Sequence, residues 1–225
     1  NYNNTRNQLR GCENDIYDMK KILIDVFKFK EENILVLLES IGGDKRPTQQ
    51  NILKGIHWLV EKNKQGCDNI WFQYSGHGTQ VKDTSGDEND GKDEAIVACD
   101  NKLIIDDLLF KRLINPMKEK TKMMAIMDCC HSGSILDLHY KYCGSTLNKI
   151  VNTKCTSKAD IVALSGCMDS QTSADATFGN VWNGALTNTL IKVLNMGKFD
   201  ITCNSLMINL INNLKASGFK QFPEM

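Results

Sequence analysis

The sequence lacks the features that identify a membrane or nucleic-acid-binding protein from composition alone. It has no apolar run approaching the roughly 18 residues needed to span a bilayer, and it shows no signal-peptide pattern. Its 27 basic and 27 acidic side chains cancel, so no overall field draws the protein to nucleic acid or to a membrane. The chain begins at Asn1 rather than at a methionine, so we expect a fragment or trimmed product whose targeting signals can be missing.

The nine cysteines lack the spacing of a structural framework. Their odd number argues against a disulfide scaffold, and 225 residues bury a sufficient core without staples. No pair has C-x-x-C spacing and the four histidines are scattered, which argues against a structural zinc site. We therefore expect most cysteines to be reduced, buried, small apolar residues of a cytoplasmic protein.

Helical and strand-like apolar patterns alternate along the whole chain. Short apolar runs typical of buried strands cover residues 34–38, 70–74, 95–98, 123–127 and 161–164. Helical stripes lie at residues 13–30, 48–60, 107–115, 183–196 and 203–217. The alternation predicts an α/β fold in which helices cover both faces of a mostly parallel sheet. Residues 139–158 are polar with little periodicity and read as a loose connection.

Two of the apolar runs lead into reactive side chains. The run 70–74 is followed by His77 between two glycines, and the run 123–127 is followed by Cys130. Loops beyond the carboxyl ends of parallel strands are where α/β proteins place their active sites. A cysteine attacks a carbonyl as a thiolate, and a nearby imidazole lowers its pKa and later protonates the leaving amine. The order, histidine first and cysteine about 50 residues later, is typical of a caspase-like thiol protease.

The glycines around these side chains fit the same chemistry. A backbone without side chains lets a substrate approach closely. The amides of Gly78 and Cys130 are therefore the predicted hydrogen-bond donors to the oxyanion of a tetrahedral intermediate.

Both motifs belong to a set that resembles the type I metacaspases, caspase-like cysteine endopeptidases that cut after arginine or lysine. The matching segments are Gly11-Cys12-Glu13-Asn14-Asp15, Ser75-Gly76-His77-Gly78, Asp128-Cys129-Cys130-His131-Ser132-Gly133 and residues 165–175. The resemblance runs nearly end to end and implies that Cys130, not Cys129, is the nucleophile. It also implies one caspase-like three-layer sandwich over residues 1–225. Its parts are a large-subunit-like part (1–138), a linker (139–158) and a small-subunit-like part (159–225).

The resemblance further implies a pocket for the basic substrate side chain, formed by Cys12, Asp15, Ser75 and Asp128. A buried guanidinium needs anionic, forked partners. Asp128 ends a hydrophobic strand, where a carboxylate is costly unless amides or a cation satisfy it. For Asp15 the alternative is an exposed charge in the first turn of a helix. Asp128 is therefore the better supported of the two.

Residues 82–94 form a polar loop that carries six acidic side chains. A solvated loop is one interpretation, and an EF-hand is excluded because Val97 stands where the terminal glutamate would be. The resemblance implies instead that Ca²⁺ binds at Asp93, Asp106, Asp107 and Asp137. Clustered carboxylates repel one another unless a cation joins them. We expect calcium to order the loops around the nucleophile.

Further expectations concern the start of the chain, its substrates and self-cleavage. In metacaspases an apolar strand precedes the Asn-Tyr pair that opens this chain, so we expect a truncated copy with its first strand missing. The expected partners are protein or peptide substrates with Arg or Lys before the cut, acted on by a monomer that binds neither nucleic acid nor membrane. Self-cleavage is expected within the linker, at Lys141, Lys149, Lys154 or Lys158. The alternatives are another caspase-like hydrolase, such as a paracaspase, and a catalytically inactive interaction module.

Overall fold

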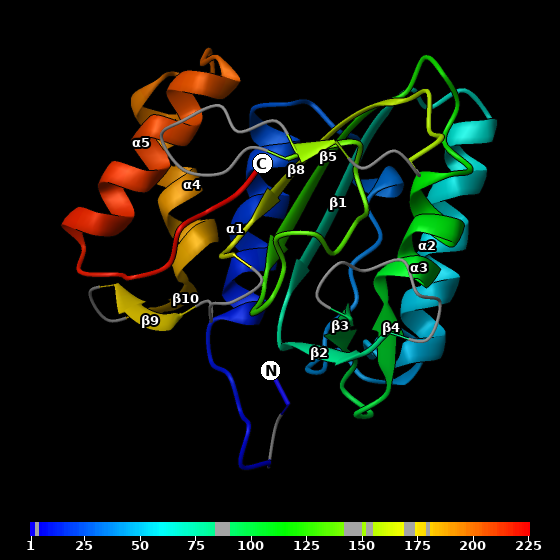
Figure 1. Cartoon of the computed structure of the whole chain (residues 1–225), viewed down its shortest axis with the longest axis horizontal. Coiled ribbons are helices and arrows are strands. Elements are labelled where there is room, and N and C mark those ends of the chain that lie inside the picture. Colours follow the sequence, from blue (N-terminus) through cyan, green and yellow to red (C-terminus); the bar gives the residue numbers. More distant parts are fainter. Residues whose placement is uncertain (3–4, 84–90, 142–149, 152–154, 169–173, 179–180) are drawn as a thin grey trace.

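A three-stranded parallel sheet forms the centre of the protein (Figure 1). The computed structural model describes all residues except 3–4, 84–90, 142–149, 152–154, 169–173 and 179–180. The central strands, in the spatial order β1-β5-β8, are β1 (Asn69–Ser75), β5 (Lys122–Asp128) and β8 (Asp160–Ser165). All three correspond to predicted apolar runs, because strands covered on both faces read as nearly continuous hydrophobic sequence.

Helices cover both faces of this sheet, as expected. On one face lies α2 (Gln49–Lys64), together with α3 (Asp106–Leu109) and the π-helical turn η3 (Phe110–Ile114). The other face carries α1 (Cys12–Asp25), α4 (Ala185–Met196) and α5 (Cys203–Ala216). The caspase-like three-layer arrangement predicted from the sequence is confirmed.

The side chains of β5 pack into two hydrophobic cores, one on each face of the sheet. Met123, Ala125 and Met127 pack into the core beneath α2, whereas Ile126 packs into the core beneath α1, α4 and α5. Successive side chains of a strand point to opposite faces, so an unbroken apolar run buries both. Burial on both sides fixes β5 in the middle of the molecule and directs its carboxyl end to one defined edge.

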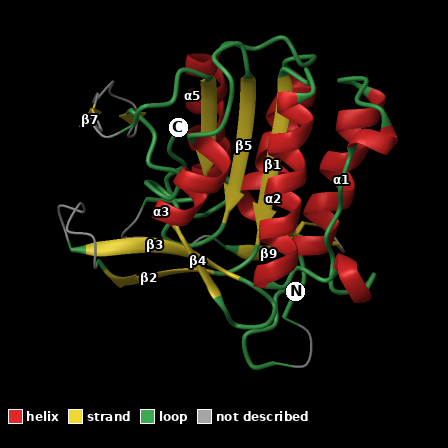
Figure 2. Cartoon of the chain, turned by 90° about the vertical axis from the view of Figure 1, so that its right-hand side faces the viewer, coloured by secondary structure: helices red, strands yellow, loops and turns green. Residues whose placement is uncertain are grey.

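A second sheet lies beyond that edge. A three-stranded antiparallel sheet consists of β2 (Gly78–Lys82), β3 (Lys92–Val97) and β4 (Leu103–Ile105). Figure 2 shows β1 and β5 pointing with their carboxyl ends toward this sheet. Two hairpins follow, made of β6 (Tyr140–Lys141) with β7 (Ile150–Val151) and of β9 (Asp175–Phe178) with β10 (Val181–Gly184). The helix predicted from 183 starts at Ala185 because β10 occupies the preceding residues.

The strand predicted at 34–38 is wrong. This segment, between the short turns η1 (Glu31–Asn33) and η2 (Gly43–Lys45), is extended but pairs with no strand in the described part of the chain. A cavity of about 550 Å³ lies between it and β1, and Leu35 remains 39 % exposed. An apolar run predicts that a segment is buried, but a β-strand also needs a neighbouring strand within hydrogen-bonding distance. Among the described residues, the edge of β1 that faces this cavity carries no paired strand.

Candidate active site

The register of the central sheet brings the predicted histidine and cysteine to the same place. The last residue pair of β1 and β5 is Ser75 with Asp128, and the Gly76 amide donates to the Asp128 carbonyl oxygen at 3.2 Å. His77 and Cys130 each follow two residues beyond that pair. Because the two strands are parallel neighbours, both side chains leave the same edge of the sheet.

Gly78 supplies the direct contact between the two loops. A Cβ on this residue would overlap the carbonyl oxygen of Cys130, so only glycine fits against the loop that follows β5, the predicted nucleophile loop (residues 129–134). The amides predicted as oxyanion donors, those of Gly78 and Cys130, therefore belong to backbone segments in van der Waals contact. The two strand ends form one site and not two separate turns.

Hydrogen bonds hold the nucleophile loop in an unusual backbone shape. The Ser132 hydroxyl donates to the Cys129 carbonyl oxygen at 2.9 Å, and the Ser165 hydroxyl donates to the Ser132 carbonyl oxygen at 2.5 Å. His131 has φ of 49°, in the left-handed region where a side chain is strained. Such strain persists where the surroundings over-determine the loop, which is common at functional sites.

The two adjacent cysteines differ sharply in environment. Cys129 is 1 % exposed, and burial, with the charge of Cys167 as a smaller cause, raises the pKa of its thiol well above the ordinary value. Cys130 is half-buried beside Gly78. A thiol held neutral in the core is a poor nucleophile, so the geometry favours Cys130 as the reactive residue.

A contact that the sequence could not reveal orients the imidazole. Nε2 of His77 lies 2.6 Å from the main-chain carbonyl oxygen of Asn7. A carbonyl oxygen only accepts, so Nε2 carries the proton and Nδ1 is the basic nitrogen. A backbone oxygen leaves no trace in the residue pattern, and sequence reasoning therefore missed Asn7.

Two buried carboxylates converge behind the nucleophile loop. Asp15 is 1 % exposed and Asp128 is 5 % exposed. A Cβ on Gly184 would overlap Asp128 Oδ2 and would lie 2.7 Å from Asp15 Oδ2, so both side chains meet over this glycine. Asp15 does lie in the first turn of α1, but the alternative of an exposed helix charge is wrong.

Hydrogen bonds from β10 and α4 satisfy these carboxylates. Asp15 Oδ1 accepts the Gly184 amide at 2.9 Å and the Asn183 side-chain amide at 3.2 Å. Asp128 Oδ2 accepts the amide and the hydroxyl of Thr187 at 2.8 and 2.9 Å. The amide of Thr187 belongs to the first turn of α4, whose dipole also favours an anion. Asn183, Gly184 and Thr187 contact the two carboxylates, and the sequence reasoning did not identify them.

The pair nevertheless carries unbalanced negative charge. Burial, and next the charge of Asp128, raise the pKa of Asp15 well above its ordinary range. The other two predicted pocket residues are close by, since Ser75 pairs with Asp128 and Cys12 precedes Asp15 by three residues on α1. Burial also raises the pKa of the Cys12 thiol. The structure thus gathers all four predicted pocket residues in a setting that an organic cation would neutralise.

A second group of carboxylates lies between β3 and the start of α3. Asp93, Glu94 and Asp106 are buried, and Asp107 and Asp137 are half-buried. Asp106 accepts the amides of Glu94 and Asp107 at 2.6 and 2.8 Å. Burial raises the pKa of Asp106 to about 8, and burial with the charges of Asp107, Glu94 and Asp93 raises that of Asp137 to about 7.

Glu94 connects this acidic group to the nucleophile loop. Its carboxylate accepts the Gln80 side-chain amide at 2.9 Å and the Ser134 hydroxyl, four residues beyond Cys130. The four residues predicted to bind calcium are all in the group. Within the described residues, no three His, Cys, Asp or Glu side chains already converge as a metal site. Carboxylate oxygens suit a hard cation. To bind one, these carboxylates would have to move toward one another.

The predicted self-cleavage segment is only partly described. Lys158 is exposed, whereas Lys149 and Lys154 lie outside the described residues. In the described ranges, no helix is both long and apolar enough to cross a bilayer.

Comparison with known proteins identifies the family. Residues 1–139 match the family described as metacaspase, peptidase C14 domain. Metacaspase-2 of Arabidopsis thaliana is 37 % identical over 211 residues, which are 87 % of this chain and 50 % of that protein. Metacaspase-1B of Neurospora crassa is 35 % identical over 86 % of this chain and 57 % of its own length. The chain therefore spans little more than half the length of these relatives.

Solved structures show the same architecture. Protein GSU0716 from Geobacter sulfurreducens superposes with a TM-score of 0.65 at 26 % identity, covering 94 % of this chain and 83 % of that one. Caspase-1 from Spodoptera frugiperda superposes with a TM-score of 0.57 at 12 % identity, covering 96 % and 78 %. The second likeness establishes the fold alone.

Proposed function

The chain belongs to the metacaspase family, and on that premise we propose that it is a calcium-dependent cysteine endopeptidase that cuts after arginine or lysine. One observation carries the proposal. His77 and Cys130 follow the same paired residues of β1 and β5, in backbone contact through Gly78 and beside two buried carboxylates. We expect the enzyme to act as a cytoplasmic monomer on protein or peptide substrates.

The proposed chemistry uses the tautomer of His77. Nδ1 takes the thiol proton of Cys130, and the sulfur adds to the substrate carbonyl carbon. The amides of Gly78 and Cys130 donate to the resulting oxyanion. The imidazolium then protonates the leaving amine as the C–N bond breaks, which leaves a thioester on Cys130. Water, deprotonated by His77, hydrolyses that thioester and restores the thiol.

Specificity in this proposal comes from Asp15 and Asp128. A guanidinium or ammonium group entering the pocket compensates the charge that otherwise raises the pKa of Asp15. The backbone and side-chain amides around the carboxylates hold them in place before the substrate arrives. An acidic substrate side chain would add to the repulsion and is excluded.

A panel of fluorogenic peptides that differ only in the residue before the cut tests this function. We expect kcat/KM to be at least about 100-fold higher for Arg and Lys than for Asp or Ala, because a buried charge without its partner is strongly unfavourable. Equal rates across the panel would contradict a pocket for basic side chains, and a preference for another residue would place the peptidase among other caspase-like hydrolases. No cleavage by a folded protein would indicate the inactive interaction module.

We propose that calcium binds at Asp93, Asp106, Asp107 and Asp137. Four carboxylates supply the oxygen ligands that Ca²⁺ prefers, and burial of Asp93 and Asp106 leaves their charge poorly screened. A bound cation would neutralise this charge. Its effect would reach Cys130 through the main chain of β3, where Glu94 holds Ser134 of the nucleophile loop. We also propose self-cleavage at the lysines of the linker.

Asp93→Asn is expected to raise the calcium concentration for half-maximal activity by at least about tenfold, the order of effect that loss of even an outer metal partner produces. The variant should also lose most of the calcium-dependent rise in melting temperature, because the cation binds the folded state. Peptide turnover and thermal unfolding in calcium titrations measure both quantities. Asp44→Asn, at an exposed site, is the matched control. Unchanged calcium dependence in Asp93→Asn would remove this residue from the metal site.

A further inference from the structure

Two phenol hydroxyls hold the main chain of His77. The His77 amide donates to the Tyr2 hydroxyl oxygen at 2.8 Å. The Tyr74 hydroxyl donates to the His77 carbonyl oxygen at 2.8 Å. Both polar backbone groups of the predicted catalytic histidine are therefore bonded to tyrosines, one from the start of the chain and one from β1.

The two hydroxyls form a connected network that ends on β3. They lie 2.9 Å apart, and the Tyr2 hydroxyl reaches the Val97 carbonyl oxygen at 2.5 Å. A consistent assignment gives each proton one acceptor: the His77 amide to Tyr2, Tyr2 to Val97, and Tyr74 to His77. Loss of the Tyr2 hydroxyl deprives the His77 amide of this acceptor, whereas loss of the Tyr74 hydroxyl leaves the His77 carbonyl oxygen with one donor, the Val97 amide at 3.0 Å.

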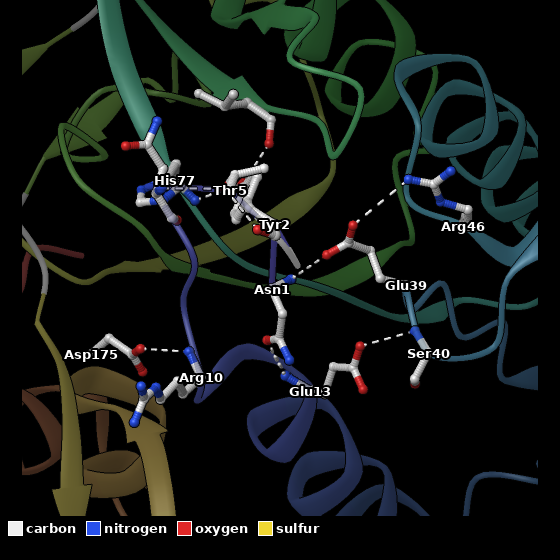
Figure 3. A network of polar contacts seen from close by, with 12 residues as sticks. Asn1, Tyr2, Thr5, Arg10, Glu13, Glu39, Ser40, Arg46, His77 and Asp175 are labelled. Carbon is white, nitrogen blue, oxygen red and sulfur yellow. Dashed lines mark hydrogen bonds and ion pairs between the residues drawn. The ribbon is translucent and has the colours of Figure 1, made fainter.

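The surroundings leave these hydroxyls little freedom. Tyr2 is 5 % exposed, and a Cβ on Gly76 would lie 2.5 Å from the Tyr74 hydroxyl and 2.8 Å from that of Tyr2. The Thr5 hydroxyl donates to the Tyr2 carbonyl oxygen at 2.7 Å. Upstream, the Asn1 amino group pairs with Glu39 at 3.2 Å. Figure 3 shows this network leading from Glu39 through Asn1 and Tyr2 to His77.

The ring of Tyr2 also touches the reactive group. Its centroid lies 4.5 Å from that of the His77 imidazole, with an interplanar angle of 46°. The two rings pack against each other, which restricts rotation of the imidazole. Burial raises the pKa of both tyrosines, so their hydroxyls keep their protons and act only as hydrogen-bonding groups.

We infer, on the basis of the proposed function, that Tyr2 and Tyr74 are positioning residues that hold His77 in the orientation needed to take the proton of Cys130. The phenols bond both polar groups of the His77 main chain, whose carbonyl oxygen also accepts from the Val97 amide, and Asn7 holds Nε2 of the imidazole. A shift of this main chain turns Nδ1 away from the sulfur. Proton transfer requires such groups within hydrogen-bonding reach, so the rate depends on this alignment.

Tyr74→Phe and Tyr2→Phe, which remove only the hydroxyls, test the inference. We expect each to lower kcat about tenfold with KM changed less than about twofold, because the substrate pocket is untouched. The double variant should lose little more than the worse single variant, since the hydroxyls act as one network. Tyr17→Phe, at a residue 48 % exposed, is the control. A normal kcat in both single variants, or losses that simply multiply, would overturn the inference.

A second measurement does not depend on peptidase activity. The rate at which iodoacetamide alkylates Cys130, followed against pH, reports how far His77 activates the thiol. We expect the alkylation profile of Tyr74→Phe to shift to higher pH, and an unchanged profile with an unchanged His77 ring titration by NMR would overturn the inference. If the wild type cleaves no peptide but this shift occurs, positioning of His77 stands and the proposed function falls. Thermal unfolding identifies a variant that has merely lost its fold. If Tyr74→Phe does not fold, the NMR titration of the His77 ring in a folded Tyr2→Phe tests the inference instead.

Discussion

Cys130→Ala is expected to abolish peptide cleavage, with a loss in kcat of roughly four orders of magnitude or more, as for removal of the nucleophile from other covalent hydrolases. Cys129→Ala, one residue away, is expected to retain turnover. The reason is the environment of each sulfur. Cys129 is buried in the core with a raised thiol pKa, whereas Cys130 lies half-buried where the loop touches Gly78.

The two variants form a matched pair for this experiment. Both lose one thiol from the same loop, so a general effect of loop disruption would appear in both. We expect Cys129→Ala to lower the free energy of unfolding by about 1 kcal/mol, a usual value for a small buried substitution. Turnover of an arginine peptide, iodoacetamide labelling read by mass spectrometry and thermal unfolding give the comparison. Activity in Cys130→Ala together with its loss in a folded Cys129→Ala would mean that the nucleophile is Cys129.

The same mass spectrometry addresses self-cleavage. If the linker is cut by the enzyme itself, fragments ending at linker lysines should form in the wild type with calcium and be missing from Cys130→Ala. Identical fragments from both proteins would point to a contaminating protease.

The parts of the fold that followed from the sequence are those governed by burial. The strands β1, β5 and β8 were predictable because strands covered on both faces must be apolar throughout. The convergence of the two strand ends was predictable because parallel neighbours deliver their loops to one edge. The same rule failed at 34–38, where the apolar run is present but no partner strand lies beside it in the described chain.

The parts that did not follow from the sequence are mostly backbone groups. The carbonyl of Asn7 orients His77, and the amides of Gly184 and Thr187 hold the pocket carboxylates. Every residue has such groups, so their use is decided only by the folded path of the chain. The second group of carboxylates, between β3 and the start of α3, could be found in the sequence. The hydrogen bond from Ser134 to Glu94 could be found only in the folded structure.

Asp128→Asn is expected to lower kcat/KM for arginine peptides about 100- to 1,000-fold, the usual effect of removing one partner of a buried charge pair. The same substitution should nevertheless stabilise the folded protein, that is, raise its free energy of unfolding. The variant keeps an oxygen that can accept from Thr187, and it removes the charge that adds to the effect of burial on Asp15. In the proposed function, the two carboxylates lower the stability of the folded protein and supply the charge that recognises a cation, a trade-off that is common at active sites.

The pH dependence of the free energy of unfolding distinguishes repulsion between Asp15 and Asp128 from general damage to the fold. The pKa of Asp15 is raised in the folded protein, so as pH rises above about 4 the unfolded chain loses this proton first. Stability therefore falls as pH rises from there toward the folded pKa. In Asp128→Asn the pKa of Asp15 moves back toward its ordinary value, so this fall becomes smaller, by about 1.4 kcal/mol for each pKa unit removed.

Thermal unfolding at several values between pH 4 and 8, with peptide turnover measured in parallel, tests both halves of this argument. Asp18→Asn is the matched control, because Asp18 is exposed and also accepts from Asn183, at 3.1 Å. It should leave turnover within about twofold, as surface substitutions usually do. An Asp128→Asn protein that cleaves arginine peptides normally would place the basic pocket elsewhere. One that is less stable than the wild type at every pH would show that the carboxylate pair is structural, and that repulsion between Asp15 and Asp128 does not set the stability of the pocket.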